Sequence, residues 1–232
     1  MRRFAAFAVL AVVAALVVLA LGHRSLAPLD LGDPAGVATG AKLAALADDF
    51  PRCRALLDRA GVRYMALPPR HDGPSCGYAD AVRFAPGGSR RIAFAPANLG
   101  IACPVAAALA MWEWDVVQPA ALRRFGVAVV AIDHFGSYNC RRISHRDVGA
   151  WSEHATADAV DVAGFRFADG RRVTVARDWQ PRGPAAEFLH DVRDGACPLF
   201  ATVLSPDYNA AHHDHLHLDQ ARRGGWGWRA CR

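Results

Sequence analysis

Two features that would assign this chain to a simple class of proteins are missing from its sequence. It has no Cys-x-x-Cys pair, and no two of its six cysteines lie closer than 23 positions, which argues against a metal site built from cysteine thiolates. It also has no internal repeat at the period of a solenoid protein. The 232 residues are 53% hydrophobic and 21% charged, as is typical of a globular fold rather than a disordered chain.

Charged and polar side chains are also absent between Phe4 and Leu21. As a helix, these 18 residues would span roughly 27 Å, close to the thickness of the hydrocarbon core of a bilayer. The hydrophobic region of a cleaved signal is shorter, about 7 to 15 residues. We therefore expect residues 1–22 to anchor the chain in the inner membrane, with the N-terminal arginines in the cytoplasm. The alternative is cleavage near Gly22, which would release the protein into the periplasm.

The cysteines agree with export, because all six follow the apolar run and their number is even. An oxidising compartment favours disulfides, and we expect three of them on the periplasmic side of the inner membrane. The spacing does not choose among the possible pairings. The cysteines are Cys53, Cys76, Cys103, Cys140, Cys197 and Cys231. A bridge to Cys231 would hold down the C-terminal tail.

Residues 23–40 are rich in Gly, Pro, Ala and Leu without a clean periodicity, so we expect a linker there. A single domain over residues 41–232 should follow. Within it, apolar spacing predicts helices over residues 51–61, 104–115, 118–125 and 184–193, and strands over 62–67, 127–132, 159–165 and 200–204. Two shorter apolar runs, at 81–84 and 92–94, predict edge strands.

The first candidate motif is the stretch from Ser152 to Asp161, which contains His154 and Asp161 among small and apolar residues. If a strand starts at residue 159, Asp161 faces one side of the sheet while Val160 and Val162 face the core. The motif therefore offers an imidazole and a carboxylate near one face of a sheet.

The second candidate motif is Asp214-His215-Leu216-His217. On a strand, His215 and His217 share a face while the leucines point to the core, an alternation that a solvated histidine run would not need. Together the two motifs supply the inventory of a catalytic zinc site with three protein ligands and an open position for water. His212 and His213 are interpreted as ordinary surface histidines.

The predicted fold class is α+β, a small antiparallel sheet that carries the zinc site on one face with helices packed on the other side. The strand over residues 127–132 runs into a segment that contains Arg141 and Arg142. Adjacent arginines usually form a solvated basic surface. A strand end beside a cleft is also a sensible place for an arginine that binds a carboxylate.

The pattern Ser-x-His-x6-Asp combined with Asp-x-x-His resembles zinc peptidases that include D-Ala-D-Ala carboxypeptidases, D-Ala-D-Ala dipeptidases and phage L-alanyl-D-glutamate endolysins. A wider set of motifs resembles a narrower family, the bacterial extensin-like C-terminal domain, over about residues 50 to 232. These motifs are Gly136 to Arg141, Ser152 to His154, Asp161 to Phe165 and Ser205 to His212.

The resemblance implies a role for each matching residue. His154, Asp161 and His217 would be zinc ligands. Asp214 would be the general base, His215 would stabilise the oxyanion beside the metal, and Arg141 and Ser152 would bind the substrate peptide. The implied activity is hydrolysis of an amide bond in peptidoglycan stem peptides or cross-links, by a protein that we expect to be a monomer.

Three departures from the peptidase pattern bear on this hypothesis. Ala157 stands where the peptidases usually have glycine. Asp214 is shorter than the glutamate of the dipeptidases, and a strict pleat would point it away from His217 unless the strand begins or bulges there. The chain also has no Pro-rich repeat of the kind found in plant extensins.

A non-catalytic cell-wall-binding module, with a structural or degenerate zinc site, is the competing hypothesis. The net charge of +5 and a pI near 9.1 fit both, because a basic surface suits anionic wall polymers and lipid headgroups. Nucleic-acid binding is disfavoured, because the positive charge is dispersed and the chain is expected to be exported.

Overall fold

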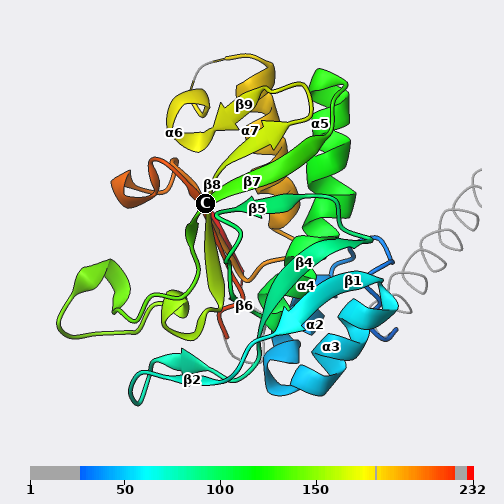
Figure 1. The fold of residues 1–232 in the computed structure, drawn as a ribbon. Coiled ribbons are helices and arrows are strands. Elements are labelled where there is room, and N and C mark those ends of the chain that lie inside the picture. The colour runs from blue at the N-terminus through cyan, green and yellow to red at the C-terminus, as the bar shows by residue number, and fades with distance from the viewer. Residues whose placement is uncertain (1–26, 181, 223–228) are drawn as a thin grey trace, which may run out of the picture.

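A mixed sheet of seven strands forms the centre of the computed structural model, which describes residues 27–180, 182–222 and 229–232 (Figure 1). The strand order is β12-β10-β11-β8-β7-β5, and β9 pairs with β8. The strands are β5 (Ala93–Ala95), β7 (Val129–Gly136), β8 (Ala159–Phe167), β9 (Arg172–Thr174), β10 (Thr202–Leu204), β11 (Leu216–Asp219) and β12 (Ala230–Cys231).

This sheet differs from the small antiparallel sheet that the sequence predicts. The central pairs are antiparallel, but β5 pairs with β7 and β10 pairs with β12 in parallel. Both parallel pairs join segments far apart in the sequence, so local patterns could not reveal them. The mixed α/β class and the single domain agree with the prediction.

One side of this sheet is covered by helices α4 (Cys103–Trp112), α5 (Gln118–Phe125) and α7 (Pro184–Ala196), as Figure 1 shows. A π-helical turn, η2 (Glu113–Val117), joins α4 to α5. Every residue of α4 is apolar and buried, which explains why the helix lies inside the molecule. Trp112 contacts Phe165 of β8 and donates a hydrogen bond of 2.8 Å to the carbonyl of Val192 on α7.

A second layer packs against α4 from the N-terminal part of the chain. It contains a three-stranded antiparallel sheet and short helices: α2 (Thr39–Ala44), η1 (Ala45–Asp48), α3 (Phe50–Arg59), β1 (Val62–Ala66), β4 (Ala81–Gly88) and β6 (Ile101–Ala102). Asp49 caps α3 by accepting from the backbone of Arg52, and Gly61 after the helix has a φ of +69°. The remaining short elements are β2 (Arg70–His71), β3 (Gly77–Tyr78), η3 (Ile143–His145), η4 (Glu153–Thr156), α6 (Val175–Asp178) and η5 (Ala210–His212).

The described part of the expected linker packs on the domain. Leu29 and Leu31 belong to the hydrophobic core, and α2 begins at Thr39. The average composition of residues 23–40 indicates a linker. Composition alone cannot show that Leu29 and Leu31 pack on an apolar surface of the domain. The expected anchor lies outside the described residues. Within those residues, no helix is both long and apolar enough to span a membrane.

The three disulfides that the cysteine count predicts are present. Their pairings are Cys53–Cys103, Cys76–Cys140 and Cys197–Cys231. The first ties α3 to α4, and the last holds the C-terminal strand beside the end of α7, as expected for the tail.

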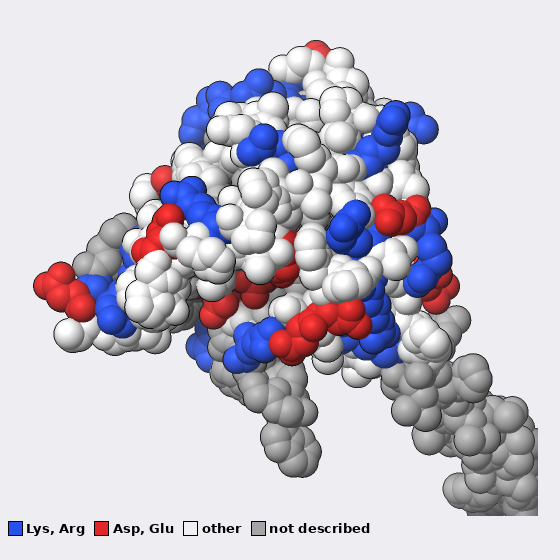
Figure 2. Space-filling view, turned by 60° about the horizontal axis from the view of Figure 1, so that its bottom comes forward, with Lys and Arg blue, Asp and Glu red and all other residues white. Residues whose placement is uncertain are grey.

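Charges of both signs are spread over the surface, but their distribution is uneven. In Figure 2, Lys and Arg side chains are scattered over the face shown, whereas Asp and Glu side chains gather across its centre. A protein with a net charge of +5 therefore has a locally acidic region.

Candidate metal centre

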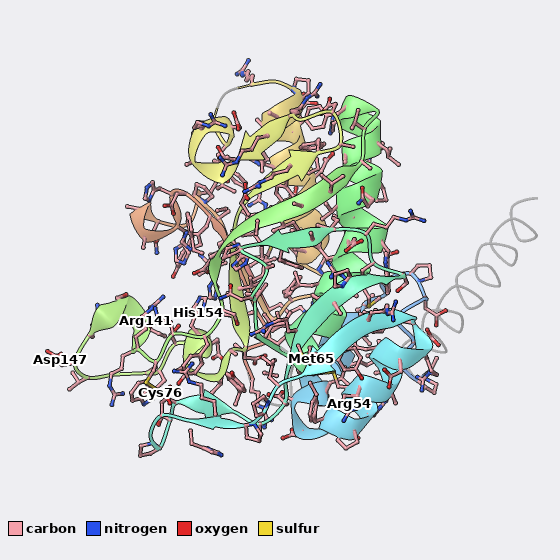
Figure 3. The ribbon with its side chains drawn as sticks, viewed as in Figure 1. Arg54, Met65, Cys76, Arg141, Asp147 and His154 are labelled. Atoms are coloured by element: carbon pink, nitrogen blue, oxygen red, sulfur yellow. A yellow bond between two sulfur atoms is a disulfide. The ribbon has the colours of Figure 1, made fainter. Side chains whose placement is uncertain are left out.

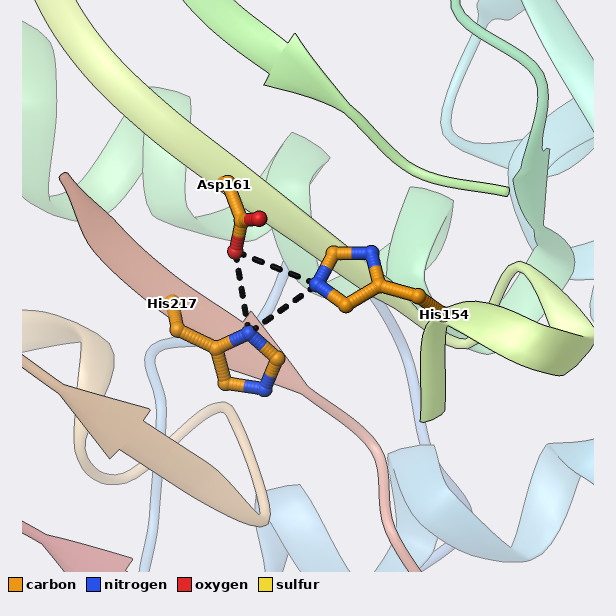
Figure 4. Close-up of side chains that lie close together, drawn as sticks. All are labelled: His154, Asp161 and His217. Atoms are coloured by element: carbon orange, nitrogen blue, oxygen red, sulfur yellow. Dashed lines mark hydrogen bonds and ion pairs between the residues drawn. The ribbon is translucent and has the colours of Figure 1, made fainter. Parts of the chain in front are cut away.

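Three of the predicted site residues, His154, Asp161 and His217, meet at one point (Figure 4). The Oδ1 atom of Asp161 lies 3.2 Å from Nε2 of His154 and 2.9 Å from Nδ1 of His217, and these two nitrogens are 3.2 Å apart. Among the described residues, this is the group of three metal-binding side chains whose ligand atoms all lie within 4.8 Å of one another.

Strand pairing places two of the three side chains. Asp161 of β8 lies directly opposite His217 of β11 in an antiparallel register. Their neighbours Val160, Val162 and Leu218 are fully buried on the opposite face. The predicted alternation of apolar and polar residues is thus confirmed on both strands, and it fixes which side chains face the site.

The turn η4 places the third side chain. The Ser152 hydroxyl caps this turn by accepting from the backbone of His154 at 3.3 Å, and the His154 carbonyl accepts from Asn139 at 2.9 Å. Ala157 ends the turn with a φ of +58°. A left-handed backbone favours glycine, so Ala157 holds a conformation that an L-residue rarely adopts.

Hydrogen bonds fix the tautomer of both histidines. Nδ1–H of His154 donates to the carbonyl of Ser137 at 2.5 Å, and Nε2–H of His217 donates to the carboxylate of Asp219 at 3.0 Å. In the neutral form of each ring, the remaining nitrogen therefore directs a lone pair toward the other ring and toward Asp161. Such lone pairs repel one another unless a cation lies between them.

The donor set fits zinc. At Zn–N and Zn–O distances of about 2.0–2.1 Å in a tetrahedral shell, neighbouring ligand atoms are roughly 3.3 Å apart, close to the spacings of this cluster. Bonds from a carbonyl and a carboxylate to the outer nitrogens are the usual support for histidine ligands. Without a metal, the cluster holds a proton instead. Burial disfavours the charged imidazolium, but bonds to Asp161 and Asp219 outweigh it and raise the pKa of His217 to about 9.

The same contacts stabilise the charged carboxylate. Burial alone would raise the pKa of Asp161, yet its hydrogen bonds to His154 and His217 lower that pKa below its ordinary value. Asp161 is thus ready to act as an anionic ligand.

The two predicted catalytic residues form a pair with each other. Nδ1 of His215 lies 2.8 Å from Oδ1 of Asp214, and Nε2 of His215 lies 3.5 Å from Oδ1 of Asp161. Asp214 thus holds the ring of His215, while His215 is the member of the pair that faces the cluster. Asp214 precedes β11, so the pleat of the strand does not constrain its direction.

Arg141 lies beside the segment that carries His154, as Figure 3 shows, and its carbonyl accepts from the backbone of Ser152 at 3.1 Å. Its Nε atom is buried and has no hydrogen-bond partner. The neighbouring Arg142 instead stacks on Trp151, with 4.4 Å between the guanidinium carbon and the ring centroid.

Sequence reasoning missed some contributors to the site. The ring of His212 lies 5.2 Å from that of His215 and 6.0 Å from that of His217. Burial, together with the neighbouring histidines, lowers the pKa of His212 to about 4. Ser137 and Asp219 hold the outer nitrogens of the ligands. Only Asp219 had a signal in the sequence, because it lies two residues after His217 on a strand.

The fold and this cluster define a mixed α/β domain in which two residues of the central sheet and one of η4 form a His/Asp/His group suited to a metal ion. The chain belongs to the family described as Extensin-like protein C-terminus, whose model matches residues 51–232. No curated protein and no solved structure matches the sequence.

Proposed function

We propose that the protein is a zinc-dependent hydrolase that cleaves an amide bond in peptidoglycan stem peptides or cross-links. The observation that carries this proposal is the convergence of two imidazole lone pairs and a carboxylate oxygen at His154, His217 and Asp161. A zinc ion bound there would supply a Lewis acid that activates water and polarises a carbonyl. The motif resemblance to the zinc peptidases supports the choice of an amide substrate.

His215 is suited to proton transfer. With Nδ1–H donated to Asp214, its Nε2 atom carries a lone pair on the side of the cluster. This nitrogen can accept a proton from the attacking water and return it to the leaving amine. Asp214, which we expected to be the base, then acts through His215 by fixing its tautomer and orientation.

Arg141 favours a peptide with a free carboxylate, and Phe135 adds an apolar contact beside the site. The partnerless Nε of Arg141 is a buried donor that an anionic group can satisfy. Phe135 is 61% exposed, and its ring lies 5.8 Å from that of His215, so it offers an apolar surface at the edge of the site. The Ser152 hydroxyl is engaged by the backbone of His154, so its first role is to position that ligand.

The location that we propose is the periplasmic side of the inner membrane, with residues 4–21 as anchor or cleaved signal. Three disulfides support an oxidising compartment. The wall peptides would be the partner of the domain.

The competing proposal is a wall-binding module with a structural zinc. Structural zinc sites have four protein ligands, whereas catalytic sites keep one position open. The cluster of the described residues has three members, and His215 beside it is held by Asp214. Three protein ligands are the number expected of a catalytic zinc site, so the cluster favours an enzyme.

The test is to incubate the zinc-loaded full-length protein and its His217→Ala variant with purified peptidoglycan and defined stem peptides, and to follow the fragments by mass spectrometry. We expect amide cleavage by the parent and none by the variant. A zinc-loaded parent that binds peptidoglycan but releases no fragment from any wall peptide would establish the binding module instead.

A further inference from the structure

A cavity of about 490 Å³ opens beside η4 and has no role in the chemistry above. Three carboxylates line it, and we call it the acidic pocket: Asp80, Glu153 and Asp158. The cation in its lining, Arg222, is paired with Asp48 at 2.6 Å. The pocket thus combines three carboxylates with one guanidinium that already has an anionic partner.

Asp158 supplies an independent indication that the pocket is a binding site. The residue is 8% exposed, and its Oδ1 atom is buried without a hydrogen-bond partner. Burial, followed by repulsion from Glu153, Asp219 and Asp80, raises the pKa of Asp158 well above its ordinary value, and the opposing attraction of Arg222 does not cancel this. A buried carboxyl oxygen in such surroundings is stabilised by a cationic hydrogen-bond donor.

The arrangement suits an organic cation better than a bare metal ion. Among the described residues, the only side chains close enough to chelate a metal together are those of the candidate metal centre. The carboxylates of the acidic pocket therefore do not converge on one point as the ligands of a metal ion would. An ammonium group does not need that convergence, because one charge-assisted hydrogen bond can satisfy the buried oxygen of Asp158 while the other carboxylates attract the charge from further away.

The rest of the lining fits a small carbon chain. Ala47, Ala79 and Ala102 offer methyl groups, and Tyr78 offers an aromatic ring that can lie against a cation or an alkyl chain. The volume lies within the range of about 300–1,000 Å³ that is typical of small-molecule sites. We propose that the acidic pocket binds a primary ammonium group carried on a short aliphatic ligand.

The experiment is isothermal titration calorimetry of the full-length protein in a non-ionic detergent. The probe is 1,5-diaminopentane, and 1,5-pentanediol is the neutral control of equal length. We expect heat from the diamine and none from the diol. No heat at millimolar diamine, or equal heats from both compounds, would overturn the proposal, as would binding of Ca²⁺ without binding of the diamine.

Two variants test whether the diamine binds in the acidic pocket. Asp158→Asn keeps the shape of the side chain but cannot become the anion that an ammonium group would hold, so it should weaken diamine binding roughly tenfold to a hundredfold, the size of a lost hydrogen bond between charged groups. Asp147→Asn, on the exposed loop labelled in Figure 3, is the matched control and should bind like the parent. Unchanged binding by a folded Asp158→Asn would contradict the assignment.

A second pair of variants keeps the test decisive if Asp158→Asn does not fold. The Arg222 side chain is 59% exposed, so Arg222→Gln should leave the fold intact. Because it removes the competing cation, it should tighten diamine binding, a gain that damage to the fold would not produce. His215→Ala, which alters the candidate metal centre through a side chain paired with Asp214, should bind the diamine like the parent and so separates this pocket from that centre. Weaker binding by Arg222→Gln, or loss of binding by His215→Ala, would overturn the proposal.

Discussion

The two faces of the β8–β11 pair have opposite chemistry on the same backbone. One face presents Val160, Val162 and Leu218, which are fully buried against the helices. The other presents Asp161 and His217, which contact each other and His154 rather than the core. The apolar face contributes the stability of the fold, and the polar face is therefore available for a site. Substitutions on the polar face should therefore affect metal binding and activity, and substitutions on the apolar face should affect the stability of the fold.

The largest effect is expected from the polar face. His217→Ala removes one of three ligands and should abolish stoichiometric zinc binding, while the disulfide-bonded fold remains. His71→Ala, a histidine on the distant β2 strand, is the matched control and should retain zinc. Metal analysis of the purified proteins checks this. Equal zinc in parent and His217→Ala would show that the cluster is not the metal site.

His215 should affect the rate without affecting the metal. His215→Ala removes the proton-transfer group and should lower hydrolysis by about 10²- to 10⁴-fold with zinc retained. Asp214→Asn leaves the ring of His215 in place but removes the anionic partner that orients it, so it should lower the rate of hydrolysis less than His215→Ala does. Rates of hydrolysis of a defined stem peptide check which variant is slower. A larger loss for Asp214→Asn than for His215→Ala would return the role of base to Asp214.

Substitutions on the apolar face should lower the stability of the fold. Leu218→Ala creates a cavity at a fully buried position and should lower the free energy of unfolding by about 2–5 kcal/mol. Because His217 keeps its register, the folded variant should still bind zinc. Denaturant unfolding with metal analysis measures both. Loss of zinc from a folded Leu218→Ala would show that the two faces are not independent.

The smallest effect is a dependence of zinc affinity on pH. In the metal-free protein His217 keeps its proton up to a pKa of about 9, above its ordinary 6.5. The proton therefore stabilises the metal-free fold fully below pH 6.5, and this contribution is lost as pH rises through 9. Zinc must displace that proton, so its affinity should rise about tenfold per pH unit between pH 7 and 9. Competition with a chelator at pH 7 and pH 8 measures the ratio of the two zinc affinities. Equal zinc affinities at the two pH values would contradict the prediction.

The same comparison explains what could be predicted from the sequence. The period of two in β8 and β11 is local, so alternation alone placed Asp161 and His217 on one face and the apolar residues on the other. The buried helix α4 was equally visible, because all of its residues are apolar. The zinc ligand set came from the resemblance, and the structure brings its three members together.

What the sequence could not show depends on contacts between distant segments. The parallel pairs of β5 with β7 and of β10 with β12 have no local signature. Nothing near Ser137 indicates that its carbonyl holds His154. The contact of Asp214 with His215 depends on how the chain enters β11, which the Asp-x-x-His spacing does not determine.

The central claim is that two imidazoles and one carboxylate hold a zinc ion with an open position. Zinc K-edge X-ray absorption of the metal-loaded full-length protein tests it most directly, because it reports the type, number and distance of the ligands. We predict a shell of nitrogen and oxygen atoms at about 2.0–2.1 Å that contains two imidazoles and no sulfur. A sulfur shell at about 2.3 Å, or a third or fourth imidazole, would contradict the account.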